Sequence, residues 1–205
     1  IDSIYLFHPQ EQPQNLYYSL PEFNLEMAFS PSHFTQINFG VNRVLVRRAV
    51  ALLDPQKNDL IADYFCGLGN FSLAVARTGG SVVGYEINES LVKQAYLNSQ
   101  ANGLDKSVRF TTSDLFSDFK NPQDVINRFD KCLIDPPRDG AENLINNFGT
   151  NGPDRIVYVS CNVATLARDS GVLVRQKGYT LKGAGLVNMF PHTSHCEAIA
   201  MFERR

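Results

Sequence analysis

The chain has 205 residues, 43% hydrophobic and 20% charged, which predicts one soluble globular domain, with or without an appendage, and excludes intrinsic disorder as its main state. Its 19 Lys and Arg against 21 Asp and Glu give a net charge of −2, which argues against a strongly basic nucleic-acid-binding domain. No apolar run approaches the roughly 20 residues that span a bilayer, and no signal-peptide pattern opens the chain. We therefore expect a cytoplasmic protein without membrane contact.

Residues 1–30 differ in composition from the rest, being aromatic, punctuated by proline and free of Lys and Arg. An apolar alternation predicts a strand with one buried face: Phe23, Leu25, Met27 and Phe29. Residues 10–14 are predicted to be a polar loop. Because the chain starts at Ile1, we interpret residues 1–30 as an N-terminal appendage or the remnant of an upstream region, and residues 31–205 as the main domain.

The hydrophobic period then becomes helical, from Val41 to Leu53, and Asp54-Pro55 ends this helix. Further helices are predicted at 70–77, 89–102, 141–148 and 163–176. Strands are predicted at 60–65, 81–86, 107–112, 131–135, 155–160, 179–187 and 196–203. Strands that alternate with helices indicate an α/β fold with a doubly wound, Rossmann-like sheet of seven strands. The last two strands follow each other without a helix, which predicts a terminal antiparallel hairpin.

Ligands of such sheets bind beyond the carboxyl ends of the strands. The pair Gly67 and Gly69 follows the first strand and lets the backbone approach a ligand. Alone the pair is weak evidence, and a tight turn between strand and helix is the alternative. Glu86 ends the second strand, where a carboxylate accepts both hydroxyls of an adenosine ribose. Glycines and acid together predict a nucleoside-containing cofactor, either NAD or S-adenosylmethionine. The carboxylate of Asp63 ahead of the glycines favours the cationic S-adenosylmethionine over a pyrophosphate.

Acids also follow the third and fourth strands, at Asp114 and Asp135. Asp135-Pro136-Pro137 predicts a rigid bend, and the alternative is an ordinary turn. Methyltransferases that act on exocyclic amines hold the amine with a related segment that ends in an aromatic residue. Arg138 stands in that place here, which counts against amine methylation.

The four cysteines are scattered along the chain: Cys66, Cys132, Cys161 and Cys196. They form no disulfide framework or metal-ligand pattern, so we predict a reducing compartment and no metal site. His192 and His195 are interpreted as hydrogen-bonding residues, because no third ligand has suitable spacing. Cys132 is expected to be a small buried residue within a strand.

Cys161 and Glu197 are the candidate catalytic residues. Cys161 stands at a strand tip just before a helix, where a thiolate is favoured, whereas free cysteines are more often merely buried. Glu197 opens the last strand among apolar neighbours, so its carboxylate could be desolvated and serve as a base. On spacing alone, an ordinary surface glutamate is the alternative.

Five segments that occur together and in order resemble the catalytic domain of the RNA uracil-5 methyltransferases: residues 34–38, 63–71, 135–138, 160–169 and 189–197. The chain is most similar to the bacterial branch that makes 5-methyluridine in 23S ribosomal RNA, from about Ser30 to the C-terminus. The resemblance implies the class I S-adenosylmethionine-dependent methyltransferase fold for residues 31–205. It also implies S-adenosylmethionine as cofactor and RNA as substrate. Full-length members usually carry an N-terminal RNA-binding β-barrel, and many hold an iron–sulfur cluster on cysteines upstream of this part.

Carried over by motif, the resemblance implies Cys161 as nucleophile and Glu197 as base. The cofactor residues that it implies are Gln36, Phe65, Asn70, Glu86, Asp114 and Asp135. At Asp114 family members can carry Asn, which weakens that assignment. The implied reaction passes through a covalent adduct between Cys161 and C6 of uracil. Three alternatives stay open: a tRNA uracil-5 methyltransferase, an exocyclic-amine methyltransferase, and an RNA-binding domain without activity.

Overall fold

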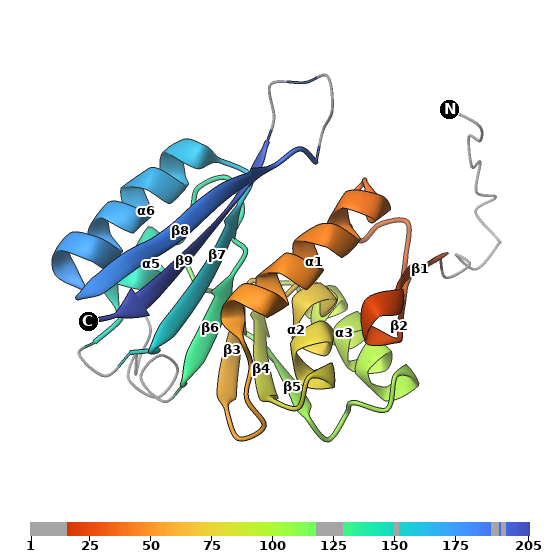
Figure 1. Ribbon diagram of the computed structural model, residues 1–205. Coiled ribbons are helices and arrows are strands. Elements are labelled where there is room, and N and C mark those ends of the chain that lie inside the picture. The colour runs from red at the N-terminus through yellow and green to blue at the C-terminus, as the bar shows by residue number, and fades with distance from the viewer. Residues whose placement is uncertain (1–15, 118–128, 150–151, 190–192, 194–195) are drawn as a thin grey trace.

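The computed structural model describes residues 16–117, 129–149, 152–189, 193 and 196–205 (Figure 1). The predicted loop at residues 10–14 and both His192 and His195 lie outside these residues. The helices are α1 (Phe39–Leu53), α2 (Asn70–Arg77), α3 (Glu89–Ala101), α5 (Glu142–Asn146) and α6 (Val163–Gln176), with a 3-10 helix η1 (Pro21–Phe23). The strands are β1 (Leu16–Leu20), β2 (Leu25–Phe29), β3 (Leu60–Tyr64), β4 (Ser81–Glu86), β5 (Val108–Thr112), β6 (Lys131–Ile134), β7 (Arg155–Ser160), β8 (Tyr179–Val187) and β9 (Glu197–Arg204).

The main sheet has seven strands in the order β5-β4-β3-β6-β7-β9-β8. Strands β3 to β7 pair in parallel, and β9 runs antiparallel between β7 and β8. This confirms the predicted doubly wound sheet with its terminal hairpin. The strand order reverses between β3 and β6, and ligands of open α/β sheets bind in the crevice at such a point.

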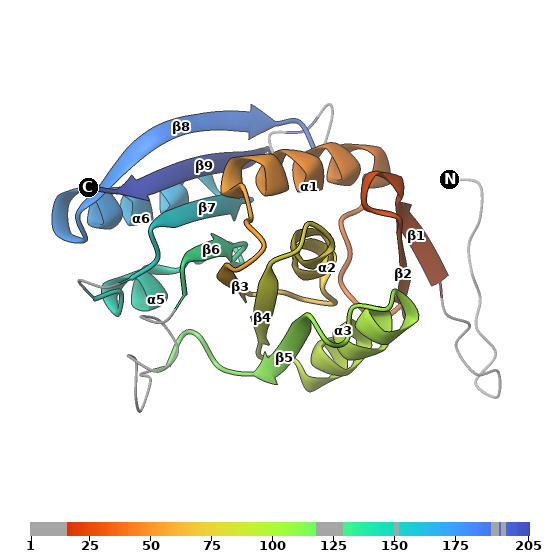
Figure 2. The same cartoon turned by 60° about the horizontal axis from the view of Figure 1, so that its bottom comes forward.

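Helices cover both faces of the sheet, with α1, α2 and α3 on one face and α5 and α6 on the other (Figure 2). Successive residues of each central strand enter opposite cores, because side chains alternate along a strand. In β7, Val157 and Val159 pack beneath α1, whereas Ile156 and Tyr158 face the α5–α6 side. A sheet buried on both faces explains why its strands are nearly continuous apolar runs in the sequence.

The residues before the main sheet form an antiparallel hairpin of β1 and β2. The alternation predicted β2, but β1 was not predicted. Leu20 and Met27 are fully buried in the core shared with α1 and α2. The side chain of Asn98 in α3 binds the strand edge, accepting from Ala28 N at 3.0 Å and donating to Ala28 O at 3.1 Å. A domain boundary at residue 30 stays a prediction.

Most predicted elements lie within one or two residues of their observed bounds, and α2, β4, β7, α6 and β8 agree at both ends. Helix α1 starts two residues earlier than the periodicity indicated, because Asn38 caps it by accepting a hydrogen bond of 3.1 Å from Val41 N. Helix α5 is shorter than predicted. No helix in the described part of the chain is long and apolar enough to cross a membrane.

Candidate active site

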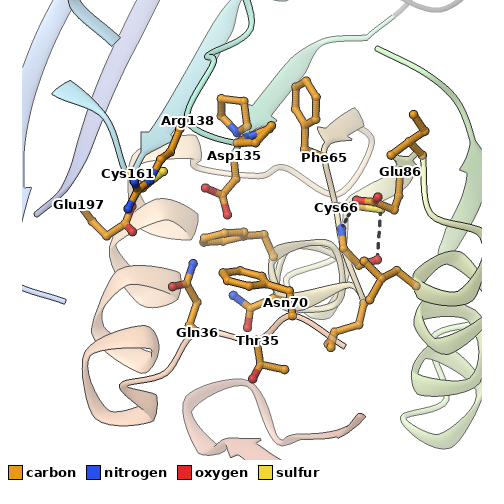
Figure 3. A pocket seen from close by; sticks show the side chains of 18 of the residues that line it. Thr35, Gln36, Phe65, Cys66, Asn70, Glu86, Asp135, Arg138, Cys161 and Glu197 are labelled. Atoms are coloured by element: carbon orange, nitrogen blue, oxygen red, sulfur yellow. Dashed lines mark hydrogen bonds between the residues drawn. The ribbon is translucent and has the colours of Figure 1, made fainter. Parts of the chain in front are cut away.

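A cavity of about 450 Å³ opens at the carboxyl ends of the central strands (Figure 3). Eight of the residues predicted from the sequence line it: Gln36, Phe65, Gly67, Asn70, Glu86, Asp135, Cys161 and Glu197. Two others are not among the described residues that line it. Gly69 stands just before α2, and Asp114 accepts a hydrogen bond of 2.9 Å from Phe116 N in its own turn. Their proposed contacts with a cofactor therefore have no support from the cavity.

The cavity also contains residues that were not assigned to a site from the sequence. Tyr18 comes from β1, a strand that carried no clear sequence signal. Phe116 follows β5 and packs against Phe65, with ring centroids 5.5 Å apart. Arg138 completes the turn after β6 and enters the same wall. An aromatic residue shortly after a strand end is the signal that could have identified Phe116.

Glu86 is held at the rim by the backbone of the glycine loop. Its Oε2 accepts a hydrogen bond of 3.2 Å from Gly67 N, and its Oε1 accepts one of 2.9 Å from Asn88 N. Gly67 adopts φ +54°, and no atom lies within 4 Å of the place that a Cβ would occupy. The loop therefore presents bare backbone and a fixed carboxylate, a combination that binds sugar hydroxyls.

Asp63 lies beneath this loop and is almost completely buried. Ser72 donates a hydrogen bond of 2.5 Å to its Oδ2, and Oδ1 has no partner among the described residues. Burial raises the pKa of Asp63 to about 7, against the lowering effect of Ser72, and the charge of Glu86 adds to the rise. Asp63 is not among the described residues that line the cavity, and its carboxyl changes charge near neutral pH.

Cys161 and Glu197 meet at one end of the cavity because their strands are neighbours. Cys161 directly follows β7 and Glu197 opens β9, next to the paired residues Ser160 and Ala198. Figure 3 shows the two side chains together with Arg138, and Glu86 at the opposite end. The sheet thus brings together two residues that lie 36 positions apart in the sequence.

The electrostatics of this end favour protonated groups. Burial raises the pKa of Glu197, which is only 3% exposed, as expected for a desolvated carboxyl. Burial, with the charges of Glu197 and Asp63, also raises the pKa of Asp135. The expectation of a thiolate at Cys161 is not met in this state, because burial first, then Glu197 and Asp135, raise the pKa of its thiol. The N-cap of α6 is Asn162, so Cys161 lies one residue outside the helix end.

Such a site can bind a cationic, hydroxyl-bearing ligand and place a thiol and a carboxyl on one target. A bound cation would lower the raised pKa values of the acidic side chains in the site, so that these side chains would be ionised beside it. Cys132 is fully buried in β6, as expected of a structural cysteine. In the described residues no group of three or more His, Cys, Asp or Glu could hold a metal ion.

The fold and the site define a Rossmann-like protein of the methyltransferase class. The structure of TYW2 from M. jannaschii in complex with AdoMet matches with a TM-score of 0.66 over 95% of this chain and 89% of that one, at 15% identity, which concerns the fold alone. The P. abyssi tRNA (uracil-54, C5)-methyltransferase in complex with S-adenosyl-L-homocysteine matches with a TM-score of 0.78 and 30% identity, over 92% of this chain and 44% of that one.

The model of the tRNA (Uracil-5-)-methyltransferase family matches residues 19–205, and the chain belongs to this family. The 23S rRNA (uracil(1939)-C(5))-methyltransferase RlmD of Dechloromonas aromatica is 54% identical over 202 residues, 98% of this chain and 46% of that protein. Its counterpart in Aromatoleum aromaticum is 55% identical over 190 residues, 92% of this chain and 44% of that protein. The chain spans about half the length of these relatives.

Proposed function

We propose that this chain is the catalytic part of an enzyme that transfers a methyl group from S-adenosylmethionine to C5 of a uridine in RNA. The observation that carries the proposal is the meeting of Cys161 and Glu197 at one end of a cavity whose other end holds Glu86. Family membership and the similarity to uracil-5 methyltransferases support it.

The cavity residues fit S-adenosylmethionine in shape and charge. The open space above Gly67 admits a ligand against the backbone, and Glu86 can accept both ribose hydroxyls. Phe65 and Phe116 offer apolar ring faces to a purine. Asp135 supplies negative charge for the cationic amino and sulfonium groups, and such a cation would lower its raised pKa. When bound, S-adenosylmethionine supplies an electrophilic methyl group.

Cys161 performs the first step of the proposed mechanism. C5 of uracil is too weak a nucleophile to accept a methyl group unaided. The partly exposed thiol of Cys161 first releases its proton to solvent. The resulting thiolate forms a bond to C6, and the C5–C6 π electrons move toward C5 and O4 as an enolate, so that C5 becomes nucleophilic. The target uridine must leave its base stack to reach this thiol, which favours a loop or a flipped base.

Glu197 performs the last step. Once C5 carries the methyl group, the carboxylate of Glu197 accepts the C5 proton, and the C–H electron pair restores the C5–C6 double bond. The C6–S bond breaks in the same process and returns Cys161 as thiolate. A buried carboxyl with a raised pKa is a stronger base than an exposed one, which suits this task.

Ribosomal RNA is the substrate that we propose, because the 23S rRNA methyltransferases are 54–55% identical to this chain and the archaeal tRNA methyltransferase only 30%. A tRNA substrate is the second candidate. Methylation of an exocyclic amine has less support, because the residue after Asp135-Pro136-Pro137 in the cavity wall is Arg138 and not an aromatic one.

The test is incubation of the chain with methyl-labelled S-adenosylmethionine and RNA that lacks natural modifications, followed by nucleoside analysis. Parallel 23S and tRNA transcripts identify the RNA class. The expected product is labelled 5-methyluridine from the 23S transcript. A labelled N-methyl nucleoside would overturn the proposal in favour of amine methylation. Cofactor binding without any labelled product would favour an RNA-binding role.

A further inference from the structure

Helix α6 and its N-cap make several polar contacts with the turn after β6. Asn162 Nδ2 donates to the carbonyl of Arg138 at 3.0 Å. The hydroxyl of Thr165 lies 3.3 Å from the same carbonyl and shares its single hydrogen with the carbonyl of Asn162 at 3.0 Å. The amide of Asn162 also caps the helix through its Oδ1, which accepts from Ala164 N at 3.0 Å. The N-cap residue Asn162 and the α6 residue Thr165 thus both contact one backbone group of the loop, the carbonyl of Arg138.

The next turn of the helix holds the following residues of that loop. Arg168 Nη2 donates to the carbonyl of Asp139 at 2.8 Å, and Ala141 N donates to Asp169 Oδ2 at 2.8 Å. The carboxylate of Asp169 is fully buried and also accepts from Tyr158 at 2.7 Å and from Arg168 at 2.9 Å. We call the four side chains of Asn162, Thr165, Arg168 and Asp169 the α6 clamp.

Gly140 fits the α6 clamp so closely that no side chain has room there. It adopts φ +81°, and a Cβ on it would lie 2.6 Å from Arg168 Nη2 and 2.7 Å from Asp169 Oδ2. The left-handed conformation and the lack of space both require glycine. The loop and the helix are therefore shaped to each other over residues 138–141, which indicates a fixed distance between them.

The α6 clamp connects two segments that line the cavity, the loop after β6 and the end of β7. Asp135 and Arg138 enter the cavity from the loop, and Cys161 enters it immediately before α6. We propose that the α6 clamp is a positioning device that holds Asp135 and Arg138 in register with Cys161, an inference that rests on the proposed function. Its four residues act through the loop and do not line the cavity themselves.

The loop also carries charges that act on the thiol. Burial is the main reason why the pKa of Cys161 is raised; in the loop, the charge of Asp135 adds to the rise and that of Arg138 opposes it more weakly. A loosened loop should therefore expose the thiol and make it react faster with a small electrophile. Methyl transfer should become slower at the same time, because the cavity side chains lose their register. Faster alkylation together with slower methyl transfer distinguishes a positioning role from a general loss of structure.

The test compares Arg168→Met with Arg175→Met, which removes the same charge from an exposed position seven residues further along α6. Alkylation of each cysteine by iodoacetamide is followed by mass spectrometry, with buried Cys132 reporting global unfolding. For Arg168→Met we expect alkylation of Cys161 to accelerate by about threefold or more while Cys132 stays protected. Methyl transfer should fall by up to about a hundredfold, the cost of a misplacement near 1 Å.

Gly140→Ala disrupts the same contact between the loop and α6 by a change in the loop. Gly103→Ala is its control. Gly103 has φ +66° but no atom within 4 Å of its Cβ position, so it shares the strain without the collision. Only Gly140→Ala should accelerate Cys161 alkylation. Equal alkylation of Cys161 in each variant and its control would overturn the clamp. Failure of the wild-type chain to make 5-methyluridine would overturn the proposed function and leave the alkylation result as a test of the clamp.

Discussion

Tyr18 donates a hydrogen bond of 2.9 Å from its hydroxyl to Oδ1 of Asn70, and so connects the N-terminal hairpin with the opposite wall of the cavity. Asn42 in α1 exchanges two further hydrogen bonds of 3.0 Å with the same amide. Oδ1 of Asn70 is thereby occupied by two donors, which leaves one hydrogen of its Nδ2 for a ligand. Asn70 is thus presented to the cavity as a donor.

The first prediction concerns this connection. Tyr18→Phe keeps the ring, which stacks on Phe39 with centroids 5.3 Å apart, and removes only the hydroxyl. We expect S-adenosylmethionine to bind about 0.5–1.5 kcal/mol more weakly, the worth of one hydrogen bond that orients Asn70. Isothermal titration calorimetry measures the change. Tyr17→Phe is the control, since Tyr17 is 58% exposed, and equal affinities of the two variants would contradict the role of Tyr18.

The second prediction concerns the acid at the end of β4. Glu86→Ala should weaken S-adenosylmethionine binding by about 1.5–3 kcal/mol, the scale of a hydrogen bond to a charged group. Glu89→Ala removes an exposed acid three residues away and should leave the affinity unchanged. Calorimetry on both variants decides the point. An unchanged affinity of Glu86→Ala would place the ribose elsewhere in the cavity.

The sheet and the main site residues could be predicted from the sequence because their signals are local. Each central strand is a short apolar run, and polar residues such as Glu86 and Asp135 stand directly at strand ends. The topology then brings these ends together, so that no further information is needed to gather them. Eight of ten predicted site residues line the cavity. Of these, Gln36, Phe65 and Asn70 were implied by the family resemblance and not by a position at a strand end.

What could not be predicted depends on contacts between distant segments. The role of Tyr18 requires the packing of β1 against α1 and α2, which leaves no periodic pattern in five residues. In the sequence Asp169 is an ordinary helix residue. Only its contacts with Tyr158 and Ala141 show that its carboxylate is buried and holds the loop. The protonated state of Cys161 likewise follows from burial beside Glu197, which a strand-tip position does not reveal.

The third prediction concerns stability and pH. The pKa of Asp63 is about 7 in the folded chain, and an unfolded aspartate titrates near 4. Between these values the folded state holds a proton that the unfolded state has released, so the contribution of Asp63 to stability is full below about pH 4 and is lost as pH rises through about 7. Asp63→Asn keeps an acceptor for Ser72 and abolishes the buried charge.

We therefore expect Asp63→Asn to melt near the wild-type temperature at pH 4 and above it at pH 8, in the absence of cofactor. Differential scanning calorimetry across this range measures the difference. Asp105→Asn, at an exposed position, should follow the wild type at both values. A constant difference between Asp63→Asn and the wild type at all pH values would show that Asp63 does not titrate in this range.

The last prediction separates the two proposed catalytic residues by the step at which the reaction stops. Cys161→Ala should abolish methyl transfer, because C5 becomes nucleophilic only after the thiolate has added to C6. Glu197→Gln keeps the thiol and should allow addition and methyl transfer, but it cannot accept the C5 proton. The result should be a covalent RNA–protein adduct that already carries the methyl label.

The adduct should survive denaturing electrophoresis and carry label from the cofactor, because the cysteine can leave only after the C5 proton has left. Glu203→Gln makes the same change in β9, at a residue that pairs with Arg155 at 2.8 Å, and should turn over normally. Cys196→Ala is the matching control for Cys161→Ala and should also turn over normally. Normal turnover of Glu197→Gln would assign the base to another group. Synthesis of 5-methyluridine by Cys161→Ala would refute the covalent mechanism itself, because no other step in it makes C5 a nucleophile.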